Sequence, residues 1–127
     1  MFYIVESSKS FYEACVDLEP VVQRLGFVVL KVDEIGAGGR HRGLEFDDEC
    51  KVFEIANDRL SEKLLAAGMC FSLAAPWRIS VFTDNGTTRI GVLRPTGIIA
   101  RLGAQAGLAG LAREIEDKLL QIVDESR

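Results

Sequence analysis

Two short β-type segments joined by Asp84-Asn85-Gly86 constrain the fold of this chain most strongly. Residues 77–83 and 87–93 are rich in β-branched and other apolar side chains, which favour strands. The Asn-Gly step tolerates the positive φ angles that tight hairpin turns require. These residues therefore predict an antiparallel hairpin.

Three further segments, residues 2–6, 27–32 and 50–56, have the same β-type composition. Ser10 and Glu13 have the spacing of a capping box, so a helix is predicted to begin there. Asn57 is a typical N-cap, and apolar residues recur at helical spacing after it.

The last apolar stripe along the chain has helical spacing and predicts a terminal helix through Leu108, Leu111, Ile115, Leu119 and Ile122. The expected fold class is therefore α+β, with a mainly antiparallel sheet of about five strands and two to three helices packed on one face. The length of 127 residues predicts a single domain over residues 1–127.

Charge and apolar content limit the classes of partner. The net charge is −4, whereas a protein that neutralises phosphates usually has a basic excess, so we expect no nucleic-acid partner. No apolar run approaches the length needed to cross a bilayer, so no membrane partner is expected. Three cysteines without a metal-binding or redox spacing indicate a reducing compartment, and we expect a cytoplasmic location.

Several predicted strands carry apolar side chains on both faces. Residues 27–30 are continuously apolar, and Val81 and Phe82 point to opposite faces of their strand. Three helices would cover one face of the sheet and leave the other partly apolar. Because a two-fold dimer is the commonest way to bury such a face, a homodimer is predicted.

Four short motifs are similar to those of one known family. They are Ile4-Val5-Glu6-Ser7, Cys50-x-x-Phe53-Glu54-x-x-Asn57, Leu73-x-x-Pro76-x-Arg78-Ile79 and Pro95-Thr96. Together they resemble the domain-of-unknown-function 302 family over nearly the whole chain. The resemblance implies a compact prokaryotic α+β fold that forms a dimer, and it implies no particular reaction.

This chain departs from the family pattern at two places. Asp58 stands where the family usually has proline, and both residue types suit the first turn of a helix. Residues 36–43 are rich in glycine, where the family tends to be helical.

Cys50 is the candidate for thiol chemistry. Alternation along a strand places Cys50 and Glu54 on one side, and Arg78 on the hairpin could approach the same surface. A cationic neighbour lowers a thiol pKa and makes the thiolate available, so sulfur transfer or redox work is one hypothesis. The alternative is that Cys50 packs as a small apolar residue.

Two candidate ligand sites remain. Arg40, His41 and Arg42 lie in the glycine-rich segment and could bind an anion, although a solvated loop is the alternative. A second candidate pocket would contain four residues that each also have an ordinary structural role: Asn57, Pro76, Arg78 and Thr96. We expect no metal and no cofactor, since a single histidine offers no ligand spacing.

The sequence thus favours a small dimeric domain that binds a small-molecule or anionic ligand, or a partner protein, without catalysis. A thiol-dependent sulfur-transfer or redox protein using Cys50 is the enzymatic alternative, and a structural or scaffolding dimer is the third.

Overall fold

The computed structural model describes residues 1–36, 47–103 and 107–127. Its elements in chain order are β1 (Phe2–Ser7), α1 (Phe11–Arg24), β2 (Val28–Glu34), β3 (Cys50–Ala56), α2 (Asp58–Ala67), the 3₁₀ helix η1 (Met69–Leu73), β4 (Trp77–Asp84), β5 (Thr87–Leu93), α3 (Pro95–Leu102) and α4 (Leu108–Ser126).

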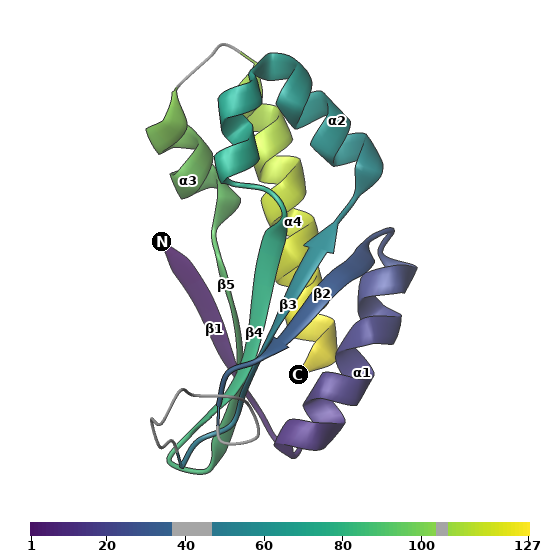
Figure 1. Ribbon diagram of the computed structural model, residues 1–127, viewed down its shortest axis with the longest axis vertical. Helices are drawn as coiled ribbons and strands as arrows, with labels where there is room; N and C mark the ends of the chain where they lie inside the picture. Colours follow the sequence, from purple (N-terminus) through teal and green to yellow (C-terminus); the bar gives the residue numbers. More distant parts are fainter. Residues whose placement is uncertain (37–46, 104–106) are drawn as a thin grey trace.

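The five strands form one antiparallel sheet in the order β1-β5-β4-β3-β2 (Figure 1). The predicted hairpin joins β4 to β5. Its turn residues Asn85 and Gly86 have φ angles of 51° and 83°, which is the left-handed conformation expected of an Asn-Gly turn. The α+β class and the antiparallel sheet are confirmed.

Helices α1 and α4 cover one face of this sheet, which lies in front of α4 in Figure 1. Fully buried side chains from both layers form the core there: Leu18, Val22, Ile55, Ile79, Ile90, Ile115, Leu119 and Ile122. The remaining helices, α2, η1 and α3, gather around the first half of α4, beyond the end of the sheet.

There are slightly more helices than the two to three predicted, because the segment before the terminal helix is itself helical. Pro95 begins α3, where the fixed φ of proline suits the first helical turn, and Gly103 ends it with a φ of 140°.

The two predicted caps form. The Ser10 hydroxyl accepts a hydrogen bond from Glu13 N at 3.1 Å at the start of α1. Asn57 Oδ1 accepts one from Leu60 N at 3.0 Å, and Asn57 Nδ2 donates to Gly26 O at 2.8 Å. Asn57 therefore caps α2 and also holds the turn between α1 and β2.

Within the three described ranges, no helix combines the length and the apolar character needed to span a bilayer.

Candidate functional site

The sheet surface opposite α1 and α4 is here called the open face. Cross-strand register determines which side chains share it, because directly opposite residues of antiparallel strands project to the same side. Glu54 lies opposite both Lys31 and Arg78. In the next row Val52 lies opposite Ser80, and this row is followed by the pair Cys50 and Phe82.

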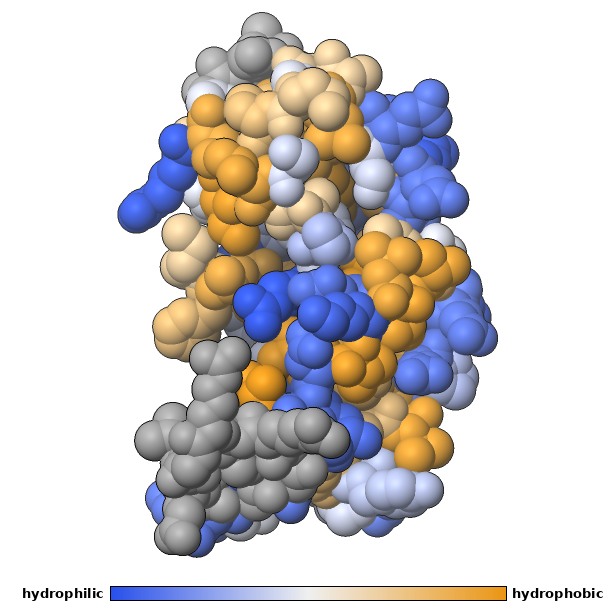
Figure 2. Space-filling view, in the orientation of Figure 1, coloured by the Kyte–Doolittle hydropathy of each residue, from blue (hydrophilic) through white to orange (hydrophobic). Residues whose placement is uncertain are grey.

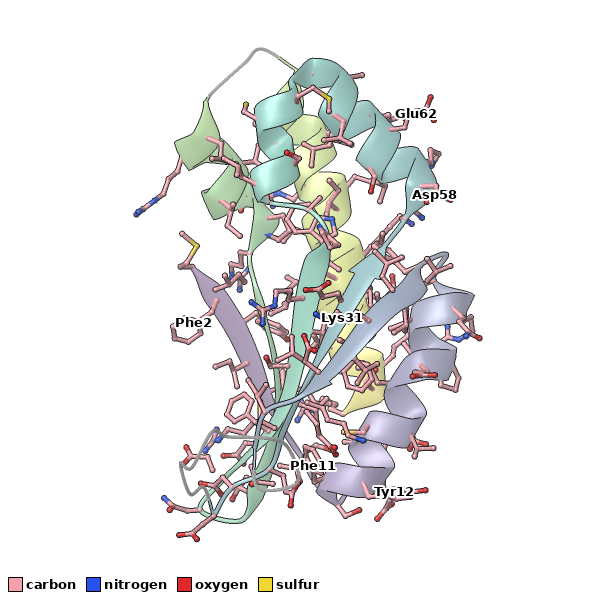
Figure 3. All side chains as sticks on the ribbon, viewed as in Figure 1. Phe2, Phe11, Tyr12, Lys31, Asp58 and Glu62 are labelled. Carbon is pink, nitrogen blue, oxygen red and sulfur yellow. The ribbon has the colours of Figure 1, made fainter. Side chains whose placement is uncertain are left out.

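Much of the open face is apolar. Its exposed apolar side chains are Phe2, 63% exposed, Leu93, 52%, Ile35, 49%, and Ile4, 41%. Figure 2 views the molecule from this side and shows a hydrophilic band with hydrophobic areas on either side of it. Phe2 and Lys31 come from the two edge strands, β1 and β2, and both are labelled in Figure 3.

A shallow groove of about 410 Å³ runs across this face, and we call it the sheet groove. Gly91 is one of its lining residues and lies directly opposite Ser80 on β4. A Cβ atom at Gly91 would stand 2.8 Å from Ile4 Cγ1, which is closer than real Cβ atoms approach a neighbour. The missing side chain therefore lets Ile4 lie close to the sheet.

Three charged side chains of the open face form an alternating row across neighbouring strands, with Lys31 positive, Glu54 negative and Arg78 positive. Lys31 Nζ lies 3.5 Å from Asp33 Oδ2. Over the described residues, neither Glu54 nor Arg78 has an ion-pair partner within 4.0 Å. Among the described residues, the Glu54 carboxylate and the Arg78 guanidinium thus lie between exposed apolar areas of this face without a partner of opposite charge in contact.

The structure brings Cys50, Glu54 and Arg78 to the same face, as the strand pattern predicted. Cys50 is half-buried, and burial raises the pKa of its thiol, an effect that the nearby positive charge of Arg78 only partly offsets. A raised pKa means less thiolate at neutral pH. Cys50 therefore has the environment of a packed thiol.

The other two cysteines lie elsewhere. Cys15 is buried on α1, where desolvation raises the pKa of its thiol to about 11. Cys70 is exposed on η1.

The four residues of the second predicted pocket are only partly brought together. Pro76 and Arg78 line a groove of about 330 Å³ between η1, β4, β5 and α3, which we call the Pro76 groove. The side chain of Asn57 is hydrogen-bonded to Leu60 N at the start of α2 and to Gly26 O. Thr96 instead faces Glu116 and a different pocket.

The predicted anion-binding residues Arg40, His41 and Arg42 lie outside the described residues. Over residues 1–36, 47–103 and 107–127, no group of three or more histidine, cysteine or acidic side chains is placed to hold a metal ion.

Sequence reasoning missed one polar cluster. Glu116 of α4 is only 5% exposed, and its Oε1 accepts hydrogen bonds from Thr96 Oγ1 at 2.7 Å and from Thr96 N at 3.2 Å. Arg94 lies 3.5 Å from the other carboxylate oxygen. A signal was present in the sequence, because Glu116 falls at helical spacing on the apolar stripe with Ala112 and Leu119.

These features define a class of protein: an α+β domain with a five-stranded antiparallel sheet, two helices on one face and a second face left open. Within this class, the chain belongs to the family described as domain of unknown function DUF302, whose model matches residues 3–126. The motif resemblance seen in the sequence is thereby confirmed.

A solved structure of the same family has the same fold. It is the crystal structure of an uncharacterised conserved DUF302 protein from Bacillus stearothermophilus, which is 26% identical to this chain. The similarity covers 99% of this chain and 98% of that one, with a TM-score of 0.91. Comparison with curated proteins gives no match.

Proposed function

We propose that this protein is a non-catalytic binding domain that works as a homodimer, with the open faces of two copies packed against each other. The observation that carries the proposal is the open face itself, which combines exposed apolar side chains with the Glu54 carboxylate and the Arg78 guanidinium, neither of which has an ion-pair partner among the described residues. A second copy of the chain would bury the exposed apolar side chains and would provide a partner of opposite charge for Glu54 and for Arg78.

The order of the charges suits a two-fold axis. Glu54 and Arg78 lie directly opposite each other on the adjacent strands β3 and β4. A two-fold axis that lies in the interface, parallel to the strands and midway between these two residues, brings each residue over its counterpart of opposite charge in the second copy. Because a two-fold interface must be self-complementary, this arrangement supports pairing with another copy of the chain.

The energetic argument rests on the apolar side chains around this pair. Burying an apolar side chain such as Phe2 or Leu93 contributes about 1.5–3 kcal/mol relative to leaving it in water. The Glu54–Arg78 pairs between the copies make the contact specific and determine how the two sheets are aligned.

A charge-reversal experiment tests this dimer. We expect light scattering to give about twice the chain mass of 14.0 kDa for the wild type. Arg78→Glu and Glu54→Arg should each be monomeric, because each homodimer would then juxtapose like charges twice. An equimolar mixture of the two variants should recover the dimer, since both cross-copy pairs are opposite in charge again.

Circular dichroism of each variant alone provides the control for folding. A wild type that stays monomeric at high concentration contradicts the proposal. Folded variants that stay dimeric alone, or a mixture that stays monomeric, contradict the assignment of the open face as the interface.

The thiol hypothesis and the purely structural hypothesis are less well supported. The raised pKa of Cys50 disfavours thiolate chemistry at neutral pH. A purely structural dimer would need only the open face. This chain also has a pocket away from that face, lined by residues of α3 and α4.

The cytoplasmic location and the prokaryotic origin belong to the same proposal, and the three unpaired cysteines support the first of them.

A further inference from the structure

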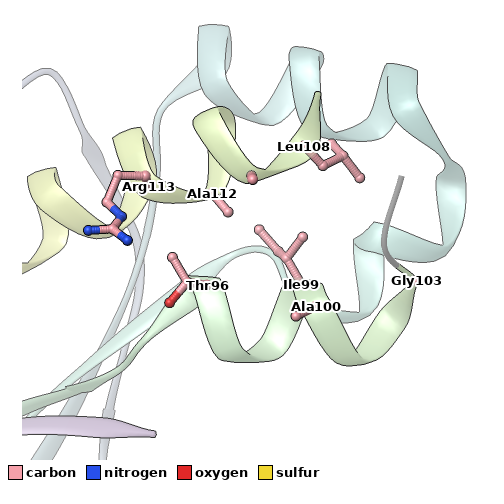
Figure 4. Close-up of a pocket in the computed structure, with 8 residues that line it drawn as sticks. Thr96, Ile99, Ala100, Gly103, Leu108, Ala112 and Arg113 are labelled. Carbon is pink, nitrogen blue, oxygen red and sulfur yellow. The ribbon is translucent and has the colours of Figure 1, made fainter. Parts of the chain in front are cut away.

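A pocket of about 230 Å³ lies between α3 and α4, and we call it the α3–α4 pocket. Figure 4 shows side chains of the two helices facing each other across it, with Ile99 on α3 opposite Ala112 on α4. Leu108 and Gly103 lie towards one end, and Thr96 and Arg113 lie at the other. The walls are mainly aliphatic.

Among the eight residues that line this pocket, Arg113 carries the one charged side chain, at the polar end beside Thr96. Glu116 is hydrogen-bonded to Thr96, and the positive charges of Arg94 and Arg113 both lower the pKa of its carboxyl group. Two guanidiniums thus accompany one buried carboxylate. Arg113 lines the pocket and has no ion-pair partner within 4.0 Å over the described residues.

The available donors determine what the polar end can bind. Thr96 Oγ1 donates its proton to Glu116, so this hydroxyl has only acceptor capacity left for a ligand. The guanidinium of Arg113 can donate two parallel hydrogen bonds, which match the two oxygens of a carboxylate. An anionic head group with an apolar body complements both ends of the pocket.

We propose that the α3–α4 pocket binds a small carboxylate whose apolar body lies between Ile99 and Ala112 and whose head group pairs with Arg113. An apolar cavity of about 150 Å³ accommodates benzene, so this pocket suits a body of about six to nine carbon atoms. The inference rests on the proposed role as a non-catalytic binding domain, and it does not depend on the dimer.

Two adjacent isoleucines can report ligand binding at the two different sites. Ile99 lines the α3–α4 pocket, whereas Ile98 lines the Pro76 groove. Methyl NMR of isoleucine-labelled protein, titrated with sodium octanoate below its micelle concentration, should shift the Ile99 signal in a saturable way and leave Ile98 largely unchanged. Octylammonium, the same chain with the opposite charge, should bind much more weakly.

Matched variants test the two ends of the pocket. Arg113→Gln should weaken octanoate binding about tenfold through loss of the charge-assisted pair. Arg101→Gln removes the same charge from α3 outside the pocket lining and should leave the affinity unchanged. Ala100→Leu, a change at an exposed lining position, should reduce the affinity by narrowing the mouth.

Three results would overturn this proposal: an unshifted Ile99 methyl, equal binding of octylammonium, or an Arg113→Gln variant with wild-type affinity. A shift at Ile98 alone would place the ligand in the Pro76 groove instead and would also overturn it. Light scattering of the same samples reports the dimer separately, so either proposal can fail without the other.

Discussion

At the scale of single residues, Glu116 connects two helices that the sequence does not obviously join. Helix α3 has no side-chain cap of its own at its N-terminus. The Glu116 carboxylate, reaching across from α4, accepts the Thr96 N–H that would otherwise lack an acceptor in the first helical turn. The negative charge also lies near the positive end of α3, where it is electrostatically favourable.

We predict that Glu116→Gln destabilises the protein by about 1–3 kcal/mol at pH 7, because the amide oxygen can still accept from Thr96 but lacks the negative charge that strengthens both hydrogen bonds and attracts Arg94. Burial alone would raise the pKa of Glu116, but the Thr96 hydrogen bonds and the charges of Arg94 and Arg113 outweigh it and lower the pKa. An unfolded glutamate has a pKa of about 4.3.

It follows that the stabilisation by Glu116 is complete above that unfolded pKa and is lost as the pH falls through the lower folded pKa. Urea unfolding over a pH series should show the two proteins converging in stability below about pH 4. Thr96→Val is the matched control and should lose less, because the backbone N–H remains. A constant difference at every pH would contradict the role assigned to the charge.

Cys50 carries the second residue-scale prediction. Because burial raises its pKa, alkylation of wild-type protein followed by mass spectrometry should show a slower reaction at Cys50 than at the exposed Cys70. In Arg78→Ala the apparent pKa of Cys50 should rise further, since the Arg78 charge lowers it. Fast labelling of Cys50 at pH 6 that is lost in Arg78→Ala would instead support the thiol hypothesis.

At the scale of secondary-structure elements, Asn57 performs two tasks with one side chain. Its Oδ1 caps α2 and its Nδ2 holds the carbonyl of Gly26, so the start of α2 is tied to the turn that leads into β2. Gly26 itself has a φ of 89°, a conformation that favours glycine.

We predict that Asn57→Ala costs about 1–2 kcal/mol of stability, since the cap and the link to Gly26 are both lost. Asn57→Asp keeps the acceptor for Leu60 N and removes only the donor to Gly26 O, so its loss should be smaller. Chemical denaturation measures both changes. An aspartate variant as unstable as the alanine variant would mean that the Gly26 link, and not the cap, carries the stabilisation.

Elements with strong local signals were predictable from the sequence, and elements defined by distant contacts were not. The β4–β5 hairpin and the Asn57 cap depend on residues close together in the chain, so their patterns are visible there. Helix α3 is short, and the acceptor for its first turn comes from the distant Glu116, so Pro95 at its first position is the one local sign of its start and was not sufficient to predict it. The same reason hides the α3–α4 pocket, whose walls meet only after both helices have packed.

At the scale of the whole molecule, strand alternation predicted that Cys50 and Glu54 would share a face, and Arg78 was a candidate to approach it. It could not predict that Thr96 would face away from Pro76 and Arg78, because that depends on how α3 crosses α4. The exposed apolar side chains of the open face were foreseen as a property of the sheet. Their arrangement around one opposite-charge pair emerged only from the cross-strand register.

The pairing of β1 with β5 has a consequence for the nascent chain. Strand β1 is made first, yet its neighbour in the sheet is the last strand to be synthesised. At a translation rate of about 5–20 residues per second, β5 is complete roughly 4 to 17 seconds after β1, and until then the backbone groups of β1 lack their partner strand. The first of the five strands therefore has no neighbour in the sheet until the last one has been made.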